Sequence, residues 1–128
     1  MNQLDPTSAL SDSARKLIMD LLSQGQAMAR LVCLGHDRYQ SDEWLQLSAK
    51  ALVIDMGEAA GRLSRVAPEL TRSHPGTSLV RMINVRNLVA HGYDHVDYEL
   101  LWTIMKDSIP TAVAALAALL DQPPPEGE

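Results

Sequence analysis

The stretch VRNLVAHGYD, residues 85–94, places an arginine, a histidine and a tyrosine within eight positions of one another. The planar guanidinium of Arg86 matches phosphate oxygens and stays charged at every physiological pH. The imidazole of His91 can give and take a proton near neutral pH. Such a pair could cleave a phosphodiester whose own hydroxyl is the nucleophile, with His91 moving protons and Arg86 stabilising the developing charge.

A helix over about residues 77–91 must position these groups, and Gly92 is well placed to end it. On a wheel of about 100° per residue, Arg86 falls in the middle of an apolar arc, whereas Asn87 and His91 fall on a polar arc. The apolar arc consists of Leu79, Met82, Ile83, Val89 and Ala90. Arg86 and His91 are about 140° apart on an ideal helix. They converge only if the helix loosens at its end or if two copies of it meet.

Each residue also has a purely structural interpretation. Arg86 could form an ion pair inside a bundle with Glu58 or Asp55, because an arginine on an apolar face needs a partner. Glu58 could instead pair with Arg62, four positions further along its own helix. His91 could simply cap the end of its helix, where the macrodipole favours a positive charge.

The remaining periodicity is also helical, and strand signals are nearly absent. We expect a first helix capped by Ser11 or Asp12 and a second one that begins after Ser41. The helix over residues 77–91 is then the third, and a fourth begins near Asp97. Pro110 should kink or split this fourth helix. The second helix carries glycines at positions 57 and 61, which predict the close approach of another helix. The fold class is therefore all-α, an antiparallel bundle of four to five helices.

Composition sets further bounds. The chain has 128 residues, a formal net charge of −5 and a single cysteine, Cys33, so we expect one domain over residues 1–121 without an internal disulfide. The Pro-rich segment 122–128 reads as a disordered tail. The longest apolar run, residues 112–120, is shorter than the roughly 20 residues that span a bilayer, and no signal peptide is apparent. These features predict a cytoplasmic protein that does not enter a membrane.

The string RNLVAHGY, residues 86–93, resembles the signature of the HEPN superfamily of ribonucleases, and more closely that of HepT-type toxins from MNT–HEPN toxin–antitoxin pairs. The segment MGEAA, residues 56–60, is similar to the family's apolar-Gly-Glu-Ala segment. The stretch HGYDHVDYELLWTIMKDSIP, residues 91–110, is similar to the region that comes after the family's motif. One departure is Leu79, which stands where the family often has tryptophan.

The resemblance implies a homodimeric, metal-independent endoribonuclease without a cofactor, in which Arg86 and His91 of both chains line one cleft and cleave RNA. Asn87 would support them by bonding phosphate or holding the ring of His91. The resemblance also implies that a cognate nucleotidyltransferase antitoxin transfers AMP to Tyr93 and so neutralises a toxin.

Two other interpretations compete with this one. Related HEPN-type bundles also occur as non-catalytic binding partners of minimal nucleotidyltransferases, and loss of the arginine or the histidine would favour that role. A metal site would need His91, Asp94, His95 and Asp97 to converge, which the expected helix end at Gly92 disfavours. His36 and His74 fall in expected loops, where solvated side chains are the simplest expectation. The sequence does not identify which RNA is cut.

Overall fold

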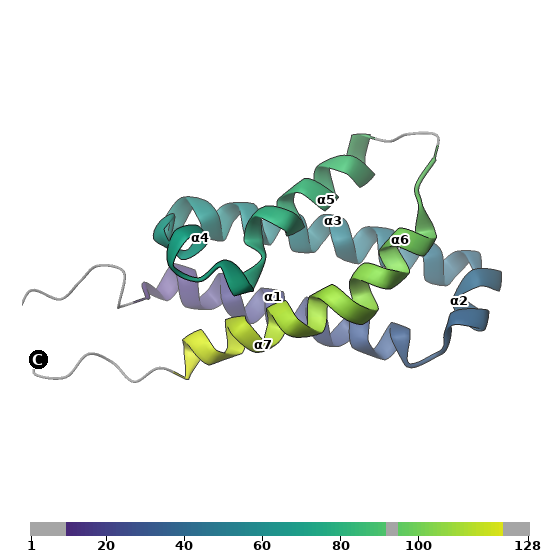
Figure 1. The fold of residues 1–128 in the computed structure, drawn as a ribbon, viewed down its shortest axis with the longest axis horizontal. Helices are drawn as coiled ribbons and strands as arrows, with labels where there is room; N and C mark the ends of the chain where they lie inside the picture. Colours follow the sequence, from purple (N-terminus) through teal and green to yellow (C-terminus); the bar gives the residue numbers. More distant parts are fainter. Residues whose placement is uncertain (1–9, 92–94, 122–128) are drawn as a thin grey trace, which may run out of the picture.

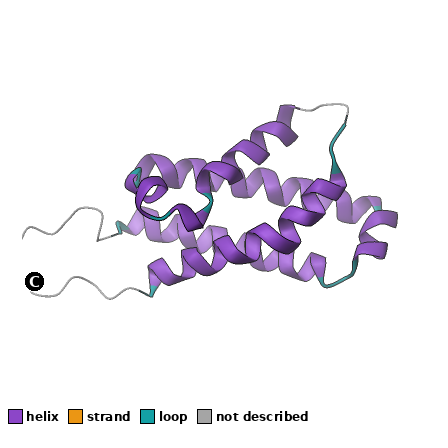
Figure 2. Ribbon diagram, viewed as in Figure 1, coloured by secondary structure: helices purple, strands orange, loops and turns teal. Residues whose placement is uncertain are grey.

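The computed structural model describes residues 10–91 and 95–121 of the chain. In chain order its elements are α1 (Asp12–Val32), α2 (His36–Ser41), α3 (Glu43–Val66), α4 (Glu69–Ser73), the 3₁₀ turn η2 (Pro75–Thr77), α5 (Leu79–His91), α6 (Tyr98–Thr103), the π-helical turn η3 (Ile104–Ser108) and α7 (Ile109–Leu120). Four long helical segments, α1, α3, α5 and the continuous α6–η3–α7, run in alternating directions (Figure 1). The described residues contain helices, turns and loops but no strand (Figure 2), which confirms the predicted all-α antiparallel bundle. The predicted tail, 122–128, lies outside the described residues.

Short polar side chains cap three helices near the predicted start points. Ser11 accepts a hydrogen bond from the backbone N–H of Ala14 at 3.1 Å, ahead of α1. The side chain of Asp42 accepts from the backbone N–H of Trp44 at 2.9 Å, and that of Asp97 accepts from the N–H of Leu100 at 3.0 Å. Each cap satisfies N–H groups that have no partner within the helix, and so each sets where the helix begins.

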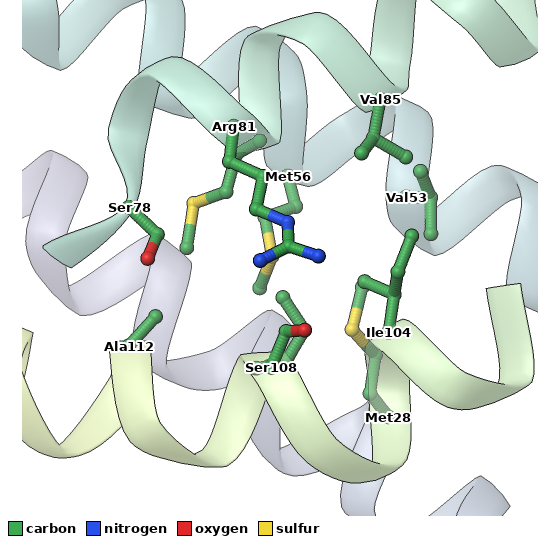
Figure 3. A pocket seen from close by; sticks show the side chains of 11 residues that line it. Met28, Val53, Met56, Ser78, Arg81, Val85, Ile104, Ser108 and Ala112 are labelled. Atoms are coloured by element: carbon green, nitrogen blue, oxygen red, sulfur yellow. The ribbon is translucent and has the colours of Figure 1, made fainter. Parts of the chain in front are cut away.

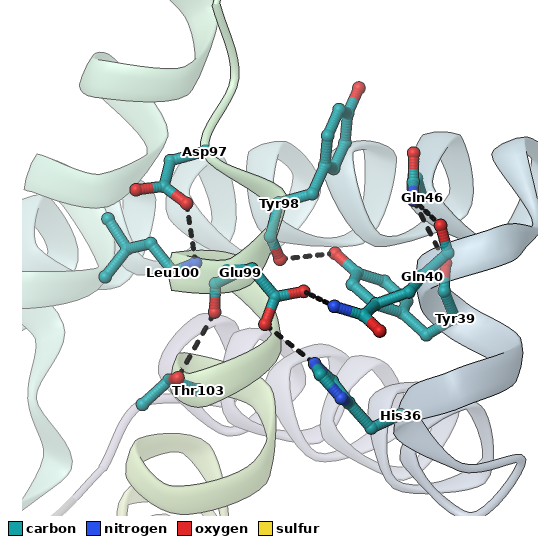
Figure 4. Close-up of polar contacts among 9 residues, drawn as sticks. All are labelled: His36, Tyr39, Gln40, Gln46, Asp97, Tyr98, Glu99, Leu100 and Thr103. Carbon is teal, nitrogen blue, oxygen red and sulfur yellow. Dashed lines mark hydrogen bonds and ion pairs between the residues drawn. The ribbon is translucent and has the colours of Figure 1, made fainter.

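The short helix α2 was not predicted, and it holds the start of α6 in place. Tyr39 of α2 is fully buried, and its hydroxyl donates to the carbonyl of Tyr98 at 2.8 Å (Figure 4). The expectation that His36 lies in a loop was wrong, because it begins α2. Its side chain is 39% exposed, but it is not simply solvated: its Nε2 lies 2.7 Å from Oε1 of Glu99, and its ring centroid lies 5.2 Å from that of Trp102. These contacts tie α2 to the chain that emerges beyond the motif helix α5.

Pro110 has no N–H to donate to the preceding turn, and the last helix departs from regular α-helical hydrogen bonding just before it, although the helix is not split in two. The turn before it widens into the π-helical η3, in which the N–H of Ile109 bonds the carbonyl of Ile104, five residues back. The resulting helical stretch, Tyr98–Leu120, is long and apolar enough to cross a membrane by length and composition alone. Its side chains at Leu101, Met105 and Leu116 belong to the same core as α1 and α3.

Candidate functional site

Gly57 sets the distance between α3 and α5, the helix that carries Arg86. A Cβ atom at Gly57 would lie 2.9 Å from the carbonyl oxygen of Met82 and 2.6 Å from Cγ of Arg86, closer than such atoms normally approach. The predicted close helix approach is therefore confirmed at Gly57. Gly61 is different, because the nearest atom to a Cβ there would be Nη1 of Arg65 at 3.7 Å, an ordinary contact.

The guanidinium of Arg86 reaches across this contact to α3. Its Nη2 lies 3.2 Å from Oε2 of Glu58, and its Nη1 donates to Oδ1 of the neighbouring Asn87 at 3.0 Å. Its Nε is buried and has no hydrogen-bond partner within the part of the chain that the structure describes. Of the partners that the sequence left open, Glu58 therefore pairs with Arg86. The Arg86 side chain is 31% exposed, so the ion pair lies at the surface rather than inside the core.

Arg86 lines an open groove of about 370 Å³ between α3 and α5. The groove is lined by Gly57, Glu58, Gly61, Arg62, Arg65, Ile83, Arg86 and Asn87. Arg62 and Arg65 were not predicted as site residues, because on sequence alone they look like the solvated face of α3. The available signal was the spacing of Glu58, Arg62 and Arg65 at i, i+4 and i+7, which places all three on one face of a helix.

His91 stands apart from this groove. It is the last residue of α5 and is exposed, five positions beyond Arg86, which corresponds to a rise of about 7.5 Å along the helix. No hydrogen bond or ion pair joins His91 to Arg86 among the described residues. Within one chain, Arg86 thus contacts Asn87 and Glu58, but Arg86 does not contact His91. Tyr93 lies outside the described residues.

A separate small cavity sits deeper in the bundle and has a different character. It encloses about 20 Å³ between α1, α3, α5 and the η3–α7 junction, which is room for about one water molecule. Apolar side chains such as Met28 and Met56 form most of its wall, and Arg81 and Ser108 approach it from the two sides (Figure 3). Because it is small and apolar and its lining excludes Arg86 and His91, we regard it as a packing defect rather than a substrate site.

Among residues 10–91 and 95–121, no group of three or more His, Cys, Asp or Glu side chains is placed to hold a metal ion. Asp94, a member of the cluster around His91 and His95, lies outside these ranges. The polar groups that line the described groove are three guanidinium groups, an amide and one carboxylate.

The all-α bundle and the Arg-polar-x-x-x-His string at the end of α5 define a HEPN-type protein. A family model described as "Ribonuclease HepT-like" matches residues 18–119, which include α5 and most of the bundle. The chain therefore belongs to the HepT-like ribonuclease family. No curated protein and no solved structure matches the chain. Leu79, at the departure from the family pattern, is 2% exposed and fills its place in the core.

Proposed function

We propose that this protein is a metal-independent endoribonuclease whose active site forms when two copies of the chain meet. The observation that carries the proposal is the exposed His91 on the same helix as Arg86, which itself faces a surface groove. Family membership supports ribonuclease-type activity. The separation of the two residues around α5 supports a composite site, since one chain does not bring them together.

The residues suit the chemistry of RNA cleavage. RNA supplies its own nucleophile, the 2′-hydroxyl, so the protein must remove that proton, protonate the leaving 5′ oxygen and stabilise a negatively charged transition state. Two copies of His91 supply a base and an acid, one from each chain. Two copies of Arg86 supply the charge, and Asn87 orients the Arg86 guanidinium through the bond already present within one chain.

In this proposal the protein is a cytoplasmic toxin of a toxin–antitoxin pair. A nucleotidyltransferase antitoxin transfers AMP from ATP to the hydroxyl of Tyr93, forming a phosphodiester with loss of pyrophosphate. The added phosphate places negative charge two residues beyond His91. There it competes with RNA for Arg86 and blocks access to the cleft.

One observation favours the alternative role of a non-catalytic binding partner. Arg86 is already paired with Glu58, so its guanidinium group is not free to bind a phosphate in the isolated chain. The pair is partly exposed and hence weak, which leaves it open to displacement by a phosphate.

Cleavage of RNA in the presence of EDTA decides between the two roles. The purified protein should cut RNA and leave DNA of the same sequence intact, because DNA lacks the 2′-hydroxyl. The products should end in a 2′,3′-cyclic or a 3′ phosphate. Arg86→Ala and His91→Ala should each lose most of this activity while keeping the helical circular-dichroism spectrum of the parent. The mechanism would be refuted if EDTA abolished cleavage. It would also be refuted if the Arg86→Ala and His91→Ala variants each cleaved RNA as well as the wild type.

A further inference from the structure

We propose that Arg62 and Arg65 on α3 bind RNA phosphates next to the scissile one, forming with Arg86 a three-arginine track along the groove. This inference rests on the proposed ribonuclease function and extends it from the reacting phosphate to its neighbours. Nothing in the sequence motif points to these two arginines.

The guanidinium groups of Arg62 and Arg65 have no structural partner among the residues that the structure describes. Within residues 10–91 and 95–121, Arg62 and Arg65 take part in no ion pair and no side-chain hydrogen bond. The obvious partner for Arg62 is Glu58, four positions earlier, but Glu58 is turned toward Arg86. Both arginines are exposed, and both line the same groove as Arg86.

The groove is positively charged although the chain as a whole is acidic. The groove contains three arginines and one glutamate, which makes +3 − 1 = +2, whereas the whole chain carries −5. A cationic groove on an acidic protein attracts a polyanion to that place, while the rest of the surface repels it. Cations gathered in this way suit a ligand with several phosphates in a row better than a single isolated anion.

The residues that line the groove suit the RNA backbone better than the bases. None of its eight lining residues is aromatic, and Gly57 and Gly61 contribute no side chains to its floor. Bases therefore find no aromatic ring to stack on in this groove, and its polar groups are mainly guanidinium donors. A groove of this kind binds the sugar–phosphate backbone and positions the strand without selecting its sequence.

The arrangement also explains why α3 supplies the extra arginines. Arg62 and Arg65 are one helical turn apart on α3, while Arg86 projects from α5 across the groove. A strand lying along the groove can place one phosphate at Arg86 and the next ones at Arg62 and Arg65. Gly57 keeps the two helices close enough for both sets to line one channel.

The test compares the double variant Arg62→Gln/Arg65→Gln with the wild type in cleavage and in binding. Cleavage is measured as kcat and KM on a short single-stranded RNA. Binding is measured by fluorescence anisotropy with a 2′-O-methyl RNA oligonucleotide, which has no free 2′-hydroxyl and is not cut. We expect KM and Kd to rise about tenfold and kcat to stay within about twofold. The slope of log K against log salt should flatten by about 1.4, the value for two lost phosphate contacts on a single strand.

Two control variants separate charge from folding. Arg62→Lys/Arg65→Lys keeps both charges and should keep most of the binding, because a lysine still attracts phosphate as a point charge. Arg30→Gln/Arg38→Gln removes the same charge from exposed positions outside the groove, and it should leave KM and Kd near wild type.

Each result has a distinct meaning. Unchanged KM, Kd and salt slope in the glutamine double variant, with an active wild type, would overturn the track and leave the ribonuclease proposal standing. A wild type that binds the oligonucleotide through these arginines but never cleaves RNA would support the track and refute the ribonuclease. A wild type that neither binds nor cleaves RNA would refute both.

Discussion

The Nη2 atom of Arg86 on α5 lies 3.2 Å from Oε2 of Glu58 on α3, and the two side chains are 31% and 45% exposed. An ion pair in such a setting contributes about 0.2–1 kcal/mol to stability. It is therefore a contact that an incoming phosphate can displace. Glu58 occupies the side of the Arg86 guanidinium that the proposed mechanism assigns to RNA, so under that proposal this carboxylate competes with RNA for Arg86.

Replacing Glu58 with glutamine should consequently improve RNA binding. Glu58→Gln keeps an oxygen that can accept from Arg86 but removes the competing charge, so KM for RNA should fall about two- to fivefold, as expected for a surface pair. Steady-state kinetics at constant salt measures this change. Asp55→Asn removes an exposed charge from the same helix outside the groove and should change KM little. A tenfold drop in kcat without a change in KM would show instead that Glu58 positions Arg86 for the reaction.

Gly57→Ala should destabilise the bundle. The new methyl group would overlap Arg86 and the backbone of Met82, which costs about 1–3 kcal/mol for overpacking, offset by about 1 kcal/mol of helix propensity. Urea denaturation should show a lower midpoint with an unchanged slope. Gly61→Ala is the matched control, since its methyl group meets only the end of Arg65 at 3.7 Å, and it should raise the midpoint slightly. Equal effects at both glycines would contradict the close contact at Gly57.

Subunit mixing tests the composite site directly. Arg86→Ala and His91→Ala proteins should each be nearly inactive, whereas a mixture unfolded and refolded together should regain part of the wild-type activity. The mixed dimer then has one intact Arg86 on one chain and one intact His91 on the other. Any activity that it regains must come from residues acting across the interface, and the missing second His91 should keep that activity well below the wild-type level. Size-exclusion chromatography with light scattering checks that dimers form. A mixture that stays as inactive as its components would show that one Arg86 and one His91 on opposite chains do not suffice for cleavage.

Alkaline pH should weaken the fold through Tyr39. Burial, followed by the charge of Glu99, raises the pKa of the Tyr39 phenol above its usual range. Because the folded-state pKa is the higher one, the associated stability is present below the unfolded value of about 10 and is lost as the pH rises above it. Tyr39→Phe should lose about 1 kcal/mol at pH 7 with its hydrogen bond to Tyr98, and should lose less additional stability between pH 9 and 11 than wild type. Thermal melts across that range measure both effects, and parallel pH profiles would contradict the assignment.

Modification of Tyr93 is tested with the antitoxin itself. Incubation with the cognate nucleotidyltransferase and ATP should add one or more AMP groups at Tyr93 and suppress RNA cleavage. Intact-mass and peptide mass spectrometry locate the adduct. Tyr93→Phe should escape both modification and inhibition if it retains activity. A neutralised complex without any adduct at Tyr93 would indicate inhibition by binding alone.

Helix starts were predictable because their causes are local. Ser11, Asp42 and Asp97 each cap the next helix within three residues, so the sequence pattern contains all of the necessary information. The helix α2 was missed because it is too short to show periodicity. Its contacts through Tyr39 and His36 reach residues about 60 positions away, and no local pattern reveals them.

The candidate site was predictable only in part for the same reason. Arg86 stood out as a cation on an apolar arc, but the choice of Glu58 as its partner depends on how α5 is aligned against α3, which Gly57 determines in three dimensions. Arg62 and Arg65 resembled any solvated helix face until the groove placed them beside Arg86. The location of His91 relative to a second Arg86 depends on a partner chain, so neither one sequence nor one folded chain contains that geometry.

The π-helical turn Ile104–Ser108 has a consequence for comparing this chain with its relatives. A π turn is equivalent to one residue inserted into an α-helix, and each inserted residue rotates the remainder of the helix by about 100°. In a relative without Pro110 and without the extra residue, the residues that form the same face of α7 would lie one position earlier in the sequence. Alignments should therefore open a single-residue gap between Leu101 and Ala112. A chimaera joined inside that window would pack its last helix out of phase even if every residue came from a stable parent.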